Sequence, residues 1–160
     1  LPALLAMWLS LTESEILGLT KSKSISSDGC YITIKEVIVK DEHNNAVVKN
    51  KGKQPTRDRT LRLPEYLKQL IDKVETDQLV TLSGTALSKR FNRLITKAGI
   101  RHMTFHDLRH VNASVMAVLR IPDKYAQERG GWKTDHIMKS TYMQTFSSER
   151  AAIDLSLIHI

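Results

Sequence analysis

The sequence predicts an α+β domain that is mostly helical and holds a small three-stranded antiparallel sheet. Three observations indicate this class. Apolar residues recur at helical spacing near the start, β-branched runs and turn signals fill the stretch from 31 to 63, and helical segments separated by Gly and Pro follow Pro64. The length of 160 residues fits one domain, and the 41% hydrophobic and 26% charged composition is typical of globular proteins.

The individual elements follow from periodicity and from the residues that interrupt it. Residues 3–19 place Leu4, Leu5, Trp8, Leu11, Ile16 and Leu19 at helical spacing, and 26–29 form a turn. We expect strands over 31–39, 46–48 and 59–63, with a hairpin turn at 41–45. Helices are then expected over 65–75, 85–98, 105–119, 123–129 and 136–146.

The charge distribution indicates an anionic partner. The net charge is +7, and the stretch from Lys49 to Arg62 carries six cations against one acid. A second basic cluster lies on one face of the helix expected over 85–98. Together they favour a nucleic acid bound through the backbone of a duplex, with strongly salt-dependent binding, since the 6% aromatic content is low for stacking on single strands. The residues expected to bind this duplex are Lys49, Lys51, Arg57, Arg59, Lys89, Arg90 and Arg93.

Several protein classes are excluded by composition. The one cysteine, Cys30, cannot form an internal disulfide or a multi-cysteine zinc site. Apolar runs stay below ~18 residues and the start has no basic region, so we expect a cytoplasmic protein without a membrane span or signal peptide. Because the chain starts inside an apolar-periodic segment without Met, we expect it to be a domain of a longer protein.

The string from Phe105 to His110 carries the clearest chemical signal. His106 and Arg109 are three residues apart and share a helix face. A cation beside the imidazole disfavours a metal, whereas the guanidinium fork suits a phosphate and the imidazole suits proton movement. His110 is more consistent with a structural role.

Taken with later strings, this motif resembles the catalytic domain of tyrosine recombinases of the phage integrase type. The resemblance rests on His106–His110, on Glu128–Trp132, on Ser140–Tyr142 and on the strand Arg59–Pro64. Glu15–Leu19 is similar to the end of the family's first motif. The resemblance implies one catalytic domain over 1–160 without the N-terminal core-binding domain. It also implies that the tail 147–160 is either a subunit-docking segment or disordered.

The same resemblance implies the roles of individual residues. Tyr142 would be the nucleophile, and Arg109 would stabilise the phosphate charge in the transition state. His106 would hydrogen-bond the phosphate or shuttle the tyrosine proton, and Trp132 would donate its indole N–H or pack the site. The general acid would be Lys53, with Lys51 as the alternative.

One position departs from the family pattern. Glu15 matches the acidic residue near the family's first arginine, but Thr12 stands where that arginine belongs. Threonine supplies no fixed charge, and losing one such donor costs on the order of 10²–10³ in rate. The resemblance therefore implies DNA recombination or integration in a mobile element, through a 3′-phosphotyrosyl intermediate and impaired by Thr12.

The implied partners are a double-stranded crossover site and three further copies of the chain on DNA, with no cofactor and no metal. Two alternatives stay open. One is an inert DNA-binding module derived from an integrase. The other is a nicking enzyme similar to type IB topoisomerases.

Overall fold

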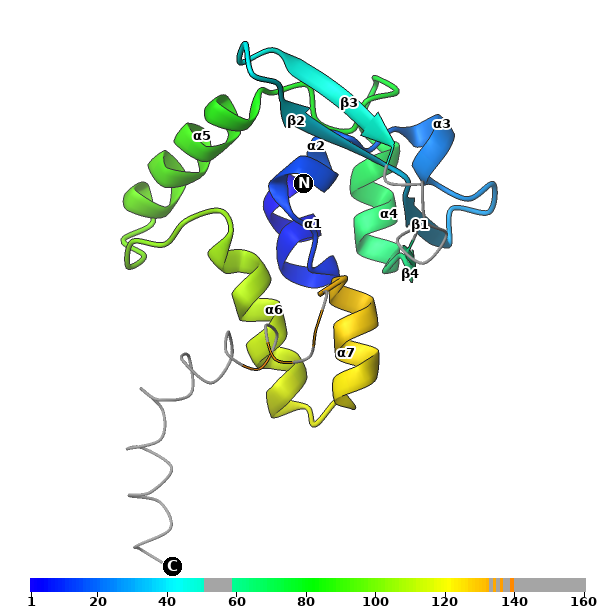
Figure 1. Cartoon of the computed structure of the whole chain (residues 1–160), viewed down its shortest axis with the longest axis vertical. Coiled ribbons are helices and arrows are strands. Elements are labelled where there is room, and N and C mark those ends of the chain that lie inside the picture. Colours follow the sequence, from blue (N-terminus) through cyan, green and yellow to red (C-terminus); the bar gives the residue numbers. More distant parts are fainter. Residues whose placement is uncertain (51–58, 133, 135, 137–138, 140–160) are drawn as a thin grey trace, which may run out of the picture.

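The computed structural model describes residues 1–50, 59–132, 134, 136 and 139. It confirms the mixed α+β class, with helices around two short antiparallel ladders (Figure 1). Helix α1 (Pro2–Leu9) lies at the centre and packs against α6 (Asp107–Val118). The predicted helix over 136–146 lies largely outside the described residues.

The segment 3–19 is divided between two helices, so the prediction of one helix over this range was wrong. After α1 come α2 (Glu13–Leu17) and α3 (Lys21–Ser24). The break occurs because Ser10 adopts the left-handed conformation, with φ of 57°. Thr12 then caps α2 in a reciprocal capping box with Glu15, which stabilises a new helix start at that point. The chain therefore turns at Ser10 and places α2 beside α1.

The three predicted strands are present, but the first is interrupted at Lys35. Strand β1 (Tyr31–Ile34) pairs with β4 (Arg59–Arg62), and β2 (Glu36–Lys40) pairs with β3 (Ala46–Asn50). Both pairs are antiparallel, so one long extended segment changes partner halfway along. Strand β2 packs on α2.

The remaining helices follow the predicted order. They are α4 (Glu65–Asp72), α5 (Gly84–Lys97), α6 and α7 (Asp123–Gly130). Each lies within three residues of its predicted bounds. Two of these helices, α6 and α7, also contact each other, and α7 contacts β4. This arrangement brings α7, near the end of the described chain, close to α1 at its start (Figure 1).

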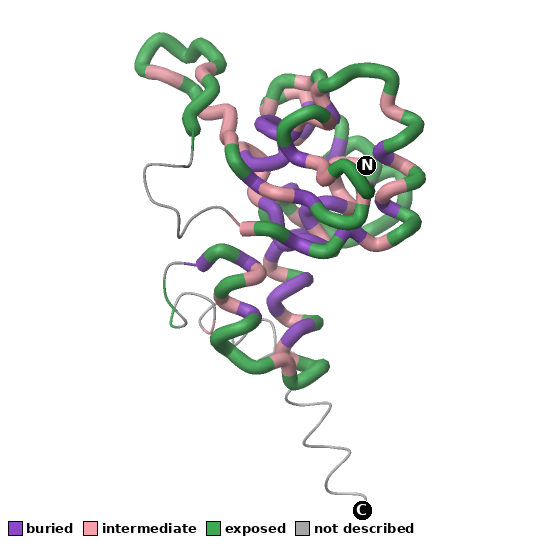
Figure 2. The backbone as a smooth tube through the Cα atoms, turned by 90° about the vertical axis from the view of Figure 1, so that its right-hand side faces the viewer, coloured by how far each residue is buried: buried purple, intermediate pink, exposed green. Residues whose placement is uncertain are grey.

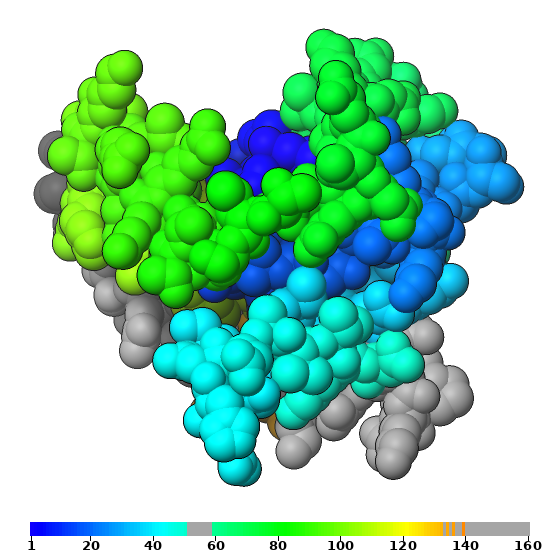
Figure 3. All heavy atoms as spheres, turned by 90° about the horizontal axis from the view of Figure 1, so that it is seen from above, coloured from blue at the N-terminus to red at the C-terminus, as the bar shows by residue number. Residues whose placement is uncertain are grey.

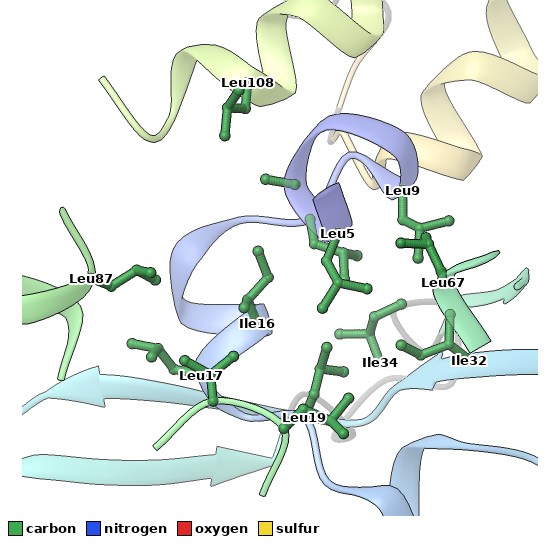
Figure 4. Close-up of a cluster of buried hydrophobic side chains, with 14 of the residues drawn as sticks. Leu5, Leu9, Ile16, Leu17, Leu19, Ile32, Ile34, Leu67, Leu87 and Leu108 are labelled. Carbon is green, nitrogen blue, oxygen red and sulfur yellow. The ribbon is translucent and has the colours of Figure 1, made fainter. Parts of the chain in front are cut away.

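The main core lies where α1, α2, β1 and α4 meet (Figure 4). Its fully buried side chains are Leu5, Leu9, Leu11, Ile16, Leu19, Ile32, Ile34 and Leu67. A second apolar cluster joins α6, α7 and the second residue after α7, through Ala113, Met116, Ala126 and Trp132. Buried positions gather in the main body and recur along α6 and α7 (Figure 2). The candidate site lies between these two clusters.

Candidate active site

Arg109 projects from α6 and is buried although it carries a charge, with 6% of its surface exposed. Its Nη1 donates a hydrogen bond to the Ser10 carbonyl oxygen. Its guanidinium carbon lies 4.5 Å from the ring centroid of Trp132, which is a cation–π contact. Burial first, and the nearby charge of Arg59 second, lower the pKa of Arg109 to about 10, so it stays protonated at neutral pH.

Trp132 is held by the glycine pair that ends α7. Gly131 adopts φ of 67°, and the Trp132 backbone N–H donates to the Gln127 carbonyl at 3.1 Å. A Cβ at Gly130 would lie 1.8 Å from the indole, so only glycine allows the ring to fold back there. The indole packs in the second apolar cluster and covers one face of Arg109.

Glu15 is almost completely buried, with 3% of its surface exposed, and its carboxylate has two kinds of partner. Oε2 accepts a hydrogen bond from the Thr12 backbone N–H at 2.8 Å. The same oxygen accepts from Arg59 Nη2 at 2.7 Å. Glu15 therefore completes the α2 cap and neutralises a buried arginine.

Arg59 is part of this site, which the sequence analysis did not anticipate. We expected it on the DNA-binding surface, whereas its side chain is 10% exposed and paired with Glu15. Its Nη1 donates to the Gly130 carbonyl, and its Nη2 also lies 3.5 Å from the Ser10 carbonyl. Because side chains alternate along a strand, Arg59 shares the face of the buried Leu61, and this alternation could have predicted the inward direction.

His106 occupies the N-cap position of α6 and is exposed. Its ring meets that of His110 edge to face, with 4.8 Å between centroids. His110 is half-buried, and its Nδ1 has no hydrogen-bond partner among the described residues. Burial first, and then the charge of His106, lower the pKa of His110. The two histidines thus lie together at the start of α6, with Arg109 one residue before His110.

The other predicted cations are divided between the surface and the undescribed part of the chain. Lys49 on β3 is exposed, as are Lys89, Arg90 and Arg93 on α5. The β2–β3 hairpin and α5 are both visible on the face seen from above (Figure 3). The predicted nucleophile Tyr142, the general acid Lys53, its alternative Lys51 and the cation Arg57 lie outside the described residues.

Residues 1–50, 59–132, 134, 136 and 139 hold no group of three or more His, Cys, Asp or Glu side chains arranged to bind a metal. Within the same residues, no helix is long and apolar enough to cross a membrane.

Comparison with known proteins gives a consistent result. The phage integrase family model matches residues 13–149. An integrase from Saccharopolyspora erythraea is 39% identical over 57 residues, which are 36% of this chain and 13% of that protein.

Two solved structures extend the similarity to the fold. The Tn1549 transposon integrase in complex with transposon right end DNA superposes with a TM-score of 0.76 at 18% identity, covering 95% of this chain and 56% of that one. XerA recombinase superposes with a TM-score of 0.64 at 15% identity, covering 91% and 54%. The chain thus spans little more than half the length of these structures.

Proposed function

The chain belongs to the phage integrase family, and from this premise we propose that it cuts and rejoins DNA strands as the catalytic domain of a tyrosine recombinase. The Tyr142 oxygen attacks the scissile phosphorus and forms a 3′-phosphotyrosyl ester, while the bond from phosphorus to the 5′ oxygen breaks. Lys53, or Lys51 in its place, donates the proton to that leaving oxygen. A 5′ hydroxyl of a second strand then attacks the ester and releases Tyr142.

The chemistry conserves the energy of the broken bond in the phosphotyrosyl ester, so it requires neither a nucleotide nor a redox cofactor. What it requires is positioning and charge stabilisation at the phosphate. Those demands fit a preorganised cationic site.

The observation that carries the proposal is the fixed, buried guanidinium of Arg109. It is stacked on Trp132 and bonded to the Ser10 carbonyl. A guanidinium has five donors, and one bond to Ser10 leaves others for phosphate oxygens. Because the group is already oriented, it does not have to reorganise when charge develops in the transition state. His106 lies at the start of the same helix, where its imidazole would hydrogen-bond the phosphate or move the Tyr142 proton.

The proposed partner is double-stranded DNA. Support comes from the net charge of +7 and from the exposed cations of β3 and α5. The Tn1549 integrase structure was solved with DNA, which extends the same expectation to this chain. We further propose that four copies assemble on one pair of crossover sites.

An inert DNA-binding module is the second candidate, and Thr12 favours it. The Thr12 hydroxyl accepts a hydrogen bond from the Glu15 backbone N–H and stands 3.2 Å from the Ser14 hydroxyl, so it caps α2 and supplies no charge. On this hypothesis the chain binds DNA with salt dependence and forms no covalent link.

A covalent-capture experiment separates the two candidates. The chain is incubated with nicked suicide duplexes carrying a randomised core, and DNA that stays attached to protein in SDS is recovered and sequenced. We expect adducts for the wild type and none for Tyr142→Phe. Adducts that appear only with Thr12→Arg would instead identify a domain inactivated at one position. DNA binding without adducts in any variant would favour the inert module.

A further inference from the structure

Two guanidinium groups converge on the carbonyl oxygen of Ser10. Arg109 donates to this oxygen from α6, and Arg59 Nη2 approaches it from β4 at 3.5 Å. The left-handed conformation of Ser10 presents the carbonyl at the end of α1, where both side chains reach it. The two positive charges repel each other, and after burial the charge of Arg59 contributes to lowering the pKa of Arg109.

The buried charges do not balance. Glu15 supplies one negative charge, 2.7 Å from Arg59, whereas Arg59 and Arg109 supply two positive charges. Burial lowers the pKa of Arg59, the charge and hydrogen bond of Glu15 raise it, and the positive charge of Arg129 is a smaller lowering contribution. An unpaired charge in a site shielded from water is costly, so the pair favours a bound anion.

The site also contains donors that the described residues do not use. Nε of Arg59 is buried without a hydrogen-bond partner among them, and so is the Ser10 hydroxyl. The other two nitrogens of the Arg59 guanidinium already bond to Gly130, Glu15 and Ser10, which fix its orientation. Arg59 is thus held in place while its Nε–H has no hydrogen-bond partner among the described residues.

Thr12 is not available as a donor to a bound anion. Its hydroxyl caps α2, and its backbone N–H bonds the same Glu15 carboxylate that pairs with Arg59. Glu15 therefore connects the Thr12 position directly to the Arg59 guanidinium.

We propose that Arg59 is the second cation of the phosphate site centred on Arg109, and that it supplies the charge that Thr12 lacks. The inference rests on the proposed function, because the anion is the scissile diester of the DNA. A diester carries one negative charge, which neutralises the surplus of the three buried groups. Nε of Arg59 is the donor that the described residues leave available for the phosphate.

The test uses a double variant, because Arg59→Gln alone would leave Glu15 buried without its partner. Arg59→Gln with Glu15→Gln removes one charge of each sign, so the net charge of the chain is unchanged. The duplex selected by covalent capture carries either a normal scissile phosphodiester or an uncharged methylphosphonate. The double variant should cleave the phosphodiester about 10² times more slowly than Glu15→Gln alone, but the methylphosphonate less than about threefold more slowly. Equal losses on both duplexes, with an unchanged melting temperature, would overturn the inference.

Adding Thr12→Arg to the double variant tests whether Arg59 acts through its charge. If it does, the new arginine restores cleavage at least about tenfold, whereas in the wild-type background the same change gives less than about threefold. A large increase in cleavage rate when Thr12→Arg is added to the wild type would mean that Arg59 does not supply the charge that Thr12 lacks.

If no cleavage occurs, the proposed function is overturned, but the inference about Arg59 is not. A binding measurement then tests whether Arg59 contacts the phosphate. In the Tyr142→Phe background, the duplex is selected by affinity instead, and its binding is compared with that of duplexes that each carry one methylphosphonate, placed at each backbone position in turn. The inference predicts about tenfold tighter binding of the phosphodiester, since hydrogen bonds to charged groups contribute on that order. This preference should disappear in the double variant; its persistence would contradict a contact from Arg59.

Discussion

At the scale of single residues, Gly131 holds a backbone φ of 67° directly against Arg59. A Cβ there would lie 1.8 Å from Arg59 Nη1, so Gly131→Ala must displace the guanidinium as well as strain the backbone. We expect the variant to lose more than the ~1–2 kcal/mol that a left-handed backbone costs an L-residue, and to lose adduct formation. Urea unfolding measures the first effect and covalent capture the second.

Gly99 provides the matched control for this prediction. Its φ is 66°, but a Cβ at Gly99 would meet nothing within 4 Å. Gly99→Ala should therefore lose about 1–2 kcal/mol through backbone strain alone and keep its adduct yield. Equal losses of stability in the two alanine variants would contradict the clash with Arg59.

His110 makes the stability depend on pH. Burial first, and the charge of His106 second, hold its pKa in the folded state below the unfolded value of 6.5. As the pH falls below 6.5, the His110 imidazole therefore takes up a proton more readily in the unfolded chain than in the folded chain. Acid thus favours unfolding. We expect the free energy of unfolding to decrease from pH 7.5 to 5.5, and to decrease less in His110→Gln. Parallel pH profiles of the two proteins would show that another group is responsible.

At the scale of secondary structure elements, the capping box holds α2 and the site together. Thr12→Ala removes the hydroxyl that accepts from the Glu15 backbone N–H, and caps of this kind contribute about 1 kcal/mol. We expect a loss of that size in urea unfolding, while Thr12→Ser retains most of the stability. A loss as large in Thr12→Ser would show that the methyl group, rather than the cap, is what matters.

Sequence periodicity was sufficient for the order of elements but not for where α1 ends. The apolar spacing continues from Leu9 through Leu11 to Ile16, although the backbone reverses at Ser10. Burial alone produces that spacing, because α1 and α2 both face the same core. A Thr followed three residues later by Glu is a helix-start signal, and it lies inside the predicted helix.

The sequence predicted those candidate site residues that lie close together in one short motif. The spacing of His106 and Arg109 predicted an anion-binding helix face from sequence alone, and the structure places both residues at the start of α6. Arg59 was missed because its role depends on partners distant in sequence, Glu15 and Gly130, which only the fold brings together. A basic run carries the same net charge whether one arginine turns inward or outward, so composition cannot distinguish the two.

At the scale of the whole molecule, the surplus of positive charge should govern DNA affinity through the salt concentration. Lys89 and Arg93 lie four residues apart on α5, share a face and are exposed. If both side chains contact backbone phosphates, the double variant Lys89→Gln/Arg93→Gln should bind DNA with a weaker salt dependence. The negative slope of the logarithm of the binding constant against the logarithm of salt concentration should become less steep by about 2. Titrations of one duplex between low and moderate salt give this slope.

The control separates local contact from total charge. Lys73 after α4 and Lys124 on α7 are also exposed, and Lys73→Gln/Lys124→Gln lowers the net charge by the same two units. Phosphate contacts release counterions only where they form, so this pair should leave the slope almost unchanged. Equal slopes in the two double variants would mean that the field of the whole molecule, rather than α5, attracts the DNA. A less steep slope in Lys89→Gln/Arg93→Gln alone would place α5 along the duplex backbone.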